Sequence, residues 1–131
     1  MRKLILLSAL LLTGCVHTLP RDLSRALNET KKIQYKRDEI GEDYWQTVEE
    51  TEKRRTGDCE DMAIYLKYLL AKRNIPSEFC VGRQFENSLP HAWVQAERKG
   101  ITYVLDPASK RWEVKTSGRY LRGFKLEWEN Y

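Results

Sequence analysis

The chain has 131 residues and lacks several features that would place it in common protein classes. Its N-terminal apolar run, Leu4 to Leu12, covers nine residues, which is too short to cross a bilayer as a helix. The formal net charge of +4 is too small to indicate a nucleic-acid partner, and it falls further if Arg2 and Lys3 are removed with a leader. No repeats or low-complexity runs are present. The four tryptophans and seven tyrosines favour one packed globular domain.

Histidine and cysteine are scarce, with two and three copies respectively. One domain histidine and two widely separated cysteines lack the paired spacing of a zinc site. His17 lies beside the N-terminal processing site, so a histidine that activates a nucleophile has to be His91. If Cys15 is consumed by processing, only Cys59 and Cys80 remain as thiols.

The N-terminus has the organisation of an export signal. Met1–Lys3 is positively charged, the apolar run follows, and Leu12–Cys15 reads Leu-Thr-Gly-Cys. This ending resembles the bacterial lipobox, which implies cleavage before Cys15 and attachment of lipid to its sulfur. Val16 at the next position implies delivery to the outer membrane, with the protein facing the periplasm. An ordinary secretory signal with a chance cysteine is the alternative.

We therefore expect residues 1–14 to be a signal peptide, 15–21 a lipidated tether, and 22–131 a single domain. Within the domain, helical spacing predicts helices over 22–35, 44–55 and 59–73. Thr47 and Glu50 form a capping-box pattern, and Tyr44 and Trp45 before them are expected to anchor in the core. Strands are predicted over 78–85, 92–98, 101–106, 111–116 and 122–128, with a tight turn at Lys99-Gly100. The fold class is α+β, an antiparallel sheet with helices on one face.

Cys59, His91 and Asp106 have the residue types of an activated cysteine nucleophile. Cys59 falls in the first turn of a predicted helix, where unpaired N–H groups and the helix dipole favour a thiolate. A hairpin turn near 99–100 places His91 opposite position 108, so Asp106 is close enough to orient it. The Cys59 amide is one candidate oxyanion donor, and Gln46 and Trp45 are candidates for the second.

Three acids flank the thiol, namely Asp58, Glu60 and Asp61. Each would raise the pKa of the thiol if it were ionised nearby. They either cap the helix and form salt bridges, or they hold a hard cation such as calcium. Capping requires no additional ligand and is the simpler interpretation.

Several segments together resemble the bacterial transglutaminase-like cysteine peptidases, a periplasmic family that includes proteases releasing surface adhesins. They are Gly57–Ile64, Tyr44–Thr51, His91 and Leu105-Asp106. The resemblance implies a papain-like, transglutaminase-type fold with the nucleophile at a helix N-terminus. It also implies a triad of Cys59, His91 and Asp106, and calcium binding by Asp58 and Glu60 as in some members.

The leading hypothesis is a membrane-anchored thiol hydrolase that cleaves peptide or amide bonds of envelope proteins through an acyl-enzyme thioester. We expect no required cofactor and no nucleic-acid partner, and the sequence does not define an oligomeric state. Two alternatives remain: a catalytically silent lipoprotein that uses the fold for binding, and a small acyltransferase or transglutaminase. A Cys59–Cys80 disulfide would inactivate the site, whereas the apolar surroundings of Cys80 favour a buried core residue.

Overall fold

A computed structural model describes residues 17–83, 89–115 and 125–129. The predicted signal peptide, Cys15 and Val16 lie outside these ranges, as do parts of three predicted strands (84–85, 116 and 122–124). No helix in the described part is long and apolar enough to span a membrane. The elements, in chain order, are α1 (Arg21–Thr30), β1 (Gln34–Tyr35), α2 (Val48–Arg54), β2 (Thr56–Gly57), α3 (Cys59–Ala71), β3 (Ser77–Arg83), β4 (His91–Arg98), β5 (Ile101–Asp106), β6 (Arg111–Val114) and β7 (Lys125–Glu129).

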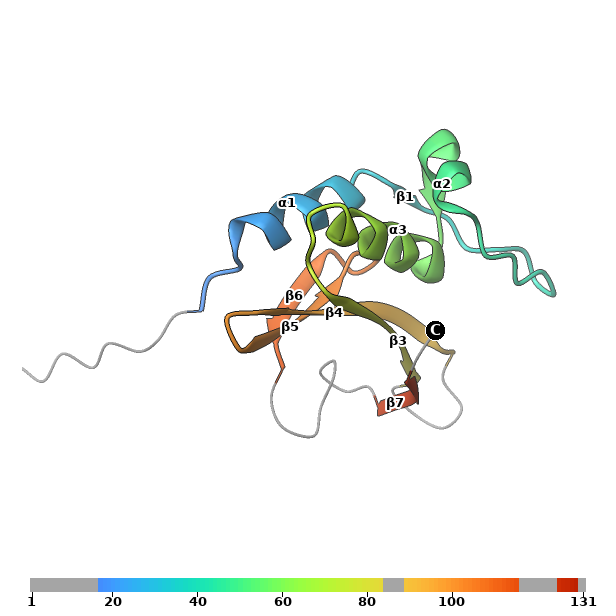
Figure 1. The fold of residues 1–131 in the computed structure, drawn as a ribbon. Helices are drawn as coiled ribbons and strands as arrows, with labels where there is room; N and C mark the ends of the chain where they lie inside the picture. The colour runs from blue at the N-terminus through green and yellow to red at the C-terminus, as the bar shows by residue number, and fades with distance from the viewer. Residues whose placement is uncertain (1–16, 84–88, 116–124, 130–131) are drawn as a thin grey trace, which may run out of the picture.

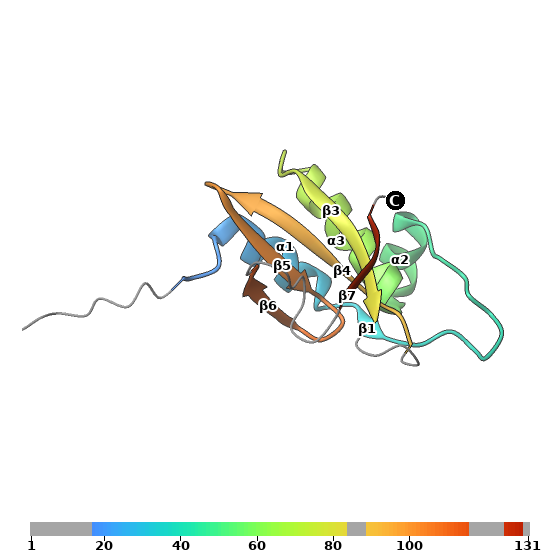
Figure 2. The ribbon, with the colours of Figure 1, turned by 90° about the horizontal axis from the view of Figure 1, so that it is seen from below.

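The main sheet is antiparallel and has five strands in the order β6-β5-β4-β3-β7. The helices lie on one face of this sheet, with α1 and α3 over its central strands (Figures 1 and 2). Helix α3 contacts β3, β4 and both other helices, so it forms the centre of the domain. The predicted α+β class is confirmed, as are helices on one face of the sheet.

The core forms where the apolar side of α3 meets the sheet. Met62, Leu66, Leu69 and Leu70, which recur at helical spacing, are all buried. The helix ends at Ala71, two residues before the predicted end, and Asn74 beyond it adopts a left-handed φ of 55°. Burial of these large side chains is the main source of stability for the domain.

The β4–β5 hairpin sets the register of the two strands that carry His91 and Asp106. Lys99 and Gly100 have φ values of 51° and 74°, the two positive angles of a type I′ turn. Strand pairing runs from Arg98↔Ile101 to Val94↔Leu105. Pairing stops there and β5 ends at Asp106, so the predicted pairing of His91 with position 108 is not formed, although His91 and Asp106 still meet.

Two expectations were wrong. The first helix ends at Thr30 and not near Tyr35, because Gln34 and Tyr35 instead pair in parallel with Thr56 and Gly57 as a two-stranded sheet. Tyr44 is not a core anchor: it is 50% exposed, and its hydroxyl donates to the Glu50 carboxylate. The neighbouring Trp45 does pack against the core, with its ring 5.6 Å from that of Phe79.

Candidate active site

Cys59 is the first residue of α3, as the sequence predicts. Asp58 caps the helix, because its Oδ1 accepts hydrogen bonds from the backbone N–H groups of Glu60 and Asp61, both at 3.1 Å. In turn, the Asp61 carboxylate accepts a hydrogen bond from the Asp58 backbone N–H at 3.2 Å, which completes a capping box. Capping is therefore the observed role of Asp58 and Asp61.

The buried side chain of Asp61 connects the start of α3 to the segment that precedes α2. Its carboxylate accepts the Gln46 backbone N–H at 2.7 Å and the Gln46 side-chain Nε2 at 2.6 Å. Nε2 also donates to the Thr56 carbonyl at 3.1 Å, so both amide hydrogens of Gln46 are used. Trp45 likewise donates its Nε1–H to Asp43 at 3.2 Å. Neither Gln46 nor Trp45 is therefore positioned as an oxyanion donor.

His91 begins β4 and Asp106 ends β5, and the structure brings their side chains together. His91 Nε2 lies 2.8 Å from Asp106 Oδ2, and the Asp106 side chain is fully buried. Burial raises the pKa of Asp106, but His91 and the backbone N–H of Ser109, 3.1 Å from Oδ1, outweigh this and hold the pKa below its usual value. Trp93 stacks beside the imidazole, with ring centroids 6.3 Å apart. The carboxylate is thus kept ionised to orient the imidazole.

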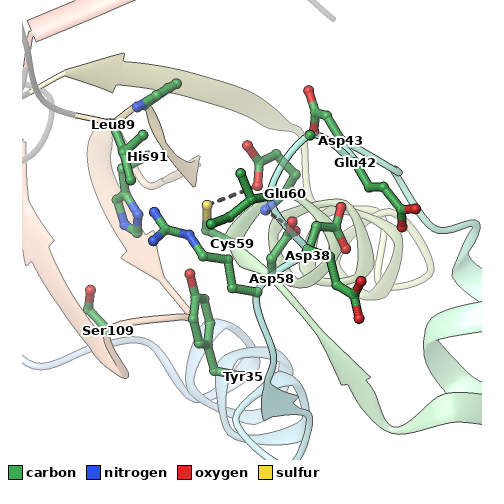
Figure 3. Close-up of a pocket in the computed structure, with 15 residues that line it drawn as sticks. Tyr35, Asp38, Glu42, Asp43, Asp58, Cys59, Glu60, Leu89, His91 and Ser109 are labelled. Atoms are coloured by element: carbon green, nitrogen blue, oxygen red, sulfur yellow. Dashed lines mark hydrogen bonds between the residues drawn. The ribbon is translucent and has the colours of Figure 1, made fainter.

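Cys59 and His91 line the same cavity of about 670 Å³. Figure 3 shows the Cys59 sulfur directed into this space, with His91 on one side, Glu60 on the other and Tyr35 at the lower edge. The loop that follows β1 supplies the outer wall, including Asp38. The structure therefore gathers all three predicted site residues around one opening, since Asp106 lies directly behind His91.

The thiol is in a protonated resting arrangement. Its Sγ lies 3.0 Å from Oε2 of Glu60, to which the S–H donates. Burial raises the pKa of Cys59, and the hydrogen bond and negative charge of Glu60 raise it further. A hydrogen bond from the backbone of Ala92 acts in the opposite direction. Glu60 is thus the flanking acid that directly opposes ionisation of the nucleophile.

Asp58 is the second electrostatic feature at the nucleophile. Burial raises its pKa from 3.8 to about 7, and the neighbouring Glu60 and Asp61 carboxylates add to the increase, against the opposing backbone hydrogen bond from Asp61. Near neutral pH this carboxyl therefore carries only part of a negative charge. That reduces its repulsion of a thiolate at Cys59.

The flanking acids do not have the geometry of a calcium site. Asp58 Oδ1 is occupied by two backbone N–H groups, and Glu60 Oε2 by the thiol. Among the described residues, no group of three or more His, Cys, Asp or Glu side chains is placed to hold a metal ion. Calcium takes six to eight oxygen ligands, so this donor set does not fit it.

Cys80 does not take part in the site. It lies on β3 and is buried, and neither it nor Cys59 forms a disulfide. The prediction of a buried core cysteine is confirmed, and the sulfur of Cys59 remains available for chemistry.

Two cavity residues were not identified from the sequence. Ser109 supports Asp106, and the Asp-Pro-x-Ser turn that contains both could have indicated it. Tyr35 lines the cavity beside Cys59 although it precedes it by a whole helix. No local pattern marks Tyr35, because its position depends on the pairing of β1 with β2.

Comparison with known proteins agrees with this architecture. Calcium-bound LapG from Legionella pneumophila superposes with a TM-score of 0.66 at 21% identity, covering 80% of this chain and 61% of that one. A candidate cysteine protease from Cytophaga hutchinsonii gives 0.54 at 18% identity, covering 66% and 30%. At these identities the likeness concerns the fold.

A sequence match is found to the zebrafish (Danio rerio) centrosomal protein of 76 kDa, 38% identical over 68 residues, which is 52% of this chain and 9% of that protein. The chain spans less than two thirds of the length of each of these three relatives. A family model described as a transglutaminase-like domain matches residues 16–128. The chain belongs to the transglutaminase-like domain family.

Proposed function

We propose that this protein is a thiol hydrolase that cleaves peptide or amide bonds with Cys59, His91 and Asp106 as its triad. The observation that carries the proposal is the 2.8 Å bond between His91 Nε2 and Asp106 Oδ2, in a cavity that also contains Cys59. A buried carboxylate paired with an imidazole, beside a helix-initial cysteine, is the arrangement that activates a thiol. The fold shared with the candidate cysteine protease from Cytophaga hutchinsonii supports the same reaction class.

The tautomer of His91 follows from this geometry. Because Nε2 faces the ionised Asp106, it carries the ring proton, and Nδ1 keeps the lone pair that can act as a base. Nδ1 would take the thiol proton as the S–H leaves Glu60. The Asp106 carboxylate would then stabilise the resulting imidazolium.

The catalytic cycle has two halves. The Cys59 thiolate adds to the substrate carbonyl, and the oxyanion is stabilised by the Cys59 backbone N–H, which has no intrahelical acceptor at the helix start. His91 Nδ1–H then protonates the departing amine as the C–N bond breaks, leaving a thioester on Cys59. Water, deprotonated by Nδ1, adds to the thioester, and the carboxylic acid and the thiol are released. We favour water over an amine acceptor because the cavity is open to solvent.

Thiol alkylation tests this proposal without knowledge of the substrate. Cys59 should react with iodoacetamide near neutral pH, as located by peptide mapping, and His91→Ala should slow the reaction. Cys59→Ala should abolish hydrolysis of added peptide esters. A Cys59 that does not alkylate, or that alkylates equally fast in His91→Ala, would refute the triad.

We also propose that the protein acts in the bacterial cell envelope, anchored through lipid on Cys15. The support is the Leu-Thr-Gly-Cys ending of the apolar leader. Substrates would then be envelope proteins or peptides. Cys15→Ser should move the protein from the membrane to the soluble fraction and remove acyl mass from the N-terminal peptide. Unchanged membrane association of the unacylated variant would contradict the anchor.

One observation favours a second candidate, a binding module without catalysis. The hydrogen bond from Cys59 to Glu60 and the raised pKa of the thiol are features of an unreactive cysteine. This candidate predicts that Cys59→Ala leaves the biological activity of the protein intact. The hydrolase predicts that the same variant is inactive.

A further inference from the structure

We infer that the hydroxyl of Tyr35 is the second oxyanion donor of the site. The inference rests on the proposed hydrolase, in which a tetrahedral intermediate at Cys59 needs two hydrogen bonds to its oxygen. The Cys59 backbone N–H can provide one of them. Three observations support Tyr35 as the donor of the second hydrogen bond: its backbone is anchored, its side chain lines the cavity, and its hydroxyl is protonated.

The backbone of Tyr35 is tied to the segment that carries the nucleophile. Strands β1 and β2 pair in parallel, with Tyr35 beside Gly57, two residues before Cys59. The N–H of Gln34 donates to the Arg55 carbonyl at 2.9 Å, and the N–H of Lys36 donates to the Gly57 carbonyl at 2.8 Å. These two bonds bracket Tyr35. Its distance from the start of α3 is therefore set by direct hydrogen bonds and not by a free loop.

The phenol ring reaches the reaction space. Tyr35 lines the same cavity as Cys59 and His91, and its side chain extends into that cavity in Figure 3. The side chain is 49% exposed, so a substrate carbonyl can approach it. Within the described part of the chain its hydroxyl forms no hydrogen bond that would compete with a substrate.

The phenol is also protonated near neutral pH. Burial raises the pKa of Tyr35 above 10.0, and the nearby Cys59 charge raises it further, although Arg37 acts in the opposite direction. A neutral phenol is a hydrogen-bond donor, whereas a phenolate is not. Tyr35 can thus donate a hydrogen bond near neutral pH.

Other side chains with donors near the site are less suitable. The N–H groups of Gln46 are already bound to Asp61 and Thr56. Ser109 lies beside Asp106, to which its backbone N–H donates at 3.1 Å, and so it belongs to the support of the imidazole. Arg37 also lines the cavity, but it lies beyond the β1–β2 pairing, which covers Gln34 and Tyr35.

Two probes with different transition states separate oxyanion stabilisation from thiol ionisation. Acylation of Cys59 by p-nitrophenyl acetate passes through a tetrahedral oxyanion, whereas alkylation by iodoacetamide does not. In Tyr35→Phe the acylation rate should fall about 100-fold, while the alkylation rate and its pH profile stay unchanged. Tyr44→Phe is the matched control, because Tyr44 is also 50% exposed but lies outside the cavity; it should change neither rate. Thermal melting by circular dichroism checks that both variants are folded.

The outcomes are distinguishable. If the full-length wild-type protein is acylated and Tyr35→Phe is acylated equally fast, the Tyr35 assignment is wrong and the hydrolase proposal stands. An equal fall in acylation and alkylation also overturns it, because Tyr35 would then act on thiol ionisation. If the acylation rate falls more in Arg37→Gln than in Tyr35→Phe, the Tyr35 assignment is wrong and the donor is the Arg37 guanidinium. No acylation in the wild type would remove the hydrolase and, with it, the role of Tyr35.

Discussion

Replacing Glu60 by glutamine should make Cys59 more reactive. Glu60 Oε2 lies 3.0 Å from Sγ, and after burial this carboxylate is the main cause of the raised thiol pKa. Glutamine has nearly the same size but no charge, and its amide can donate a hydrogen bond to a thiolate. The substitution therefore removes repulsion from the ionised state and can add an attraction to it.

The size of the effect follows from the distance between the two groups. Two unit charges separated by 3.0 Å repel by about 1.4 kcal/mol in bulk water and about 5.5 kcal/mol at an effective dielectric of ~20. Glu60 is half-buried, so the true value lies between these limits. At about 1.4 kcal/mol per pKa unit, the pKa of Cys59 should fall by at least one unit. A thiolate of lower pKa is a weaker nucleophile, so alkylation at fixed neutral pH should accelerate by about threefold per unit.

The assay is the pH dependence of iodoacetamide alkylation, with Cys59 resolved from the other thiols by peptide mapping. Glu49→Gln is the matched control, because it removes the same charge from an exposed position in the first turn of α2, outside the cavity. It should leave the profile of Cys59 unchanged. A pKa in Glu60→Gln that is equal to or above that of the wild type would refute the electrostatic account of the resting thiol.

Three further predictions concern the residues around the nucleophile. Asp58→Asn keeps a side chain that can cap α3 but removes the carboxyl group. The pKa of that carboxyl is about 7 in the folded protein, against 3.8 in the unfolded chain. Since stability falls as pH rises through that window, the variant should melt at a higher temperature than the wild type above pH 7 and show a flatter pH profile; equal slopes would contradict this. In Gly57→Ala the added Cβ would lie 2.7 Å from Asp61 Cβ. Urea unfolding should therefore show a free energy of unfolding that is lower by roughly 1–3 kcal/mol, and a decrease of only a few tenths of a kcal/mol would contradict this. Because Asp58 and Glu60 are hydrogen-bonded within the site, calcium and EGTA should give the same alkylation rate of Cys59, and a calcium-dependent rate would show that the two acids rearrange around the ion.

The contact between His91 and Asp106 shows how far local sequence rules reach. The Lys99-Gly100 turn specifies a two-residue hairpin, and alternation along its strands then sets the register. His91 and Asp106 meet as a consequence of that register. The capping pattern of Thr47 and Glu50 is equally local, and it is observed with both hydrogen bonds.

The errors come from competition between local preference and distant partners. Residues 31–35 follow a helical pattern, yet the backbone of Gln34 and Tyr35 pairs with Thr56 and Gly57. Tertiary pairing of this kind overrides a weak helical preference. Ile33, just before this pairing, is buried in the core.

The sequence by itself determined the α+β class, the place of Cys59 at a helix start and the pairing of His91 with Asp106, because capping, periodicity and turn chemistry act over a few residues. Only the tertiary structure decided the surroundings of the thiol. Tyr35 reaches the cavity through a two-residue parallel pairing, and Gln46 is committed to Asp61 fifteen positions away. Such contacts depend on how separate elements pack, and no short-range pattern encodes them.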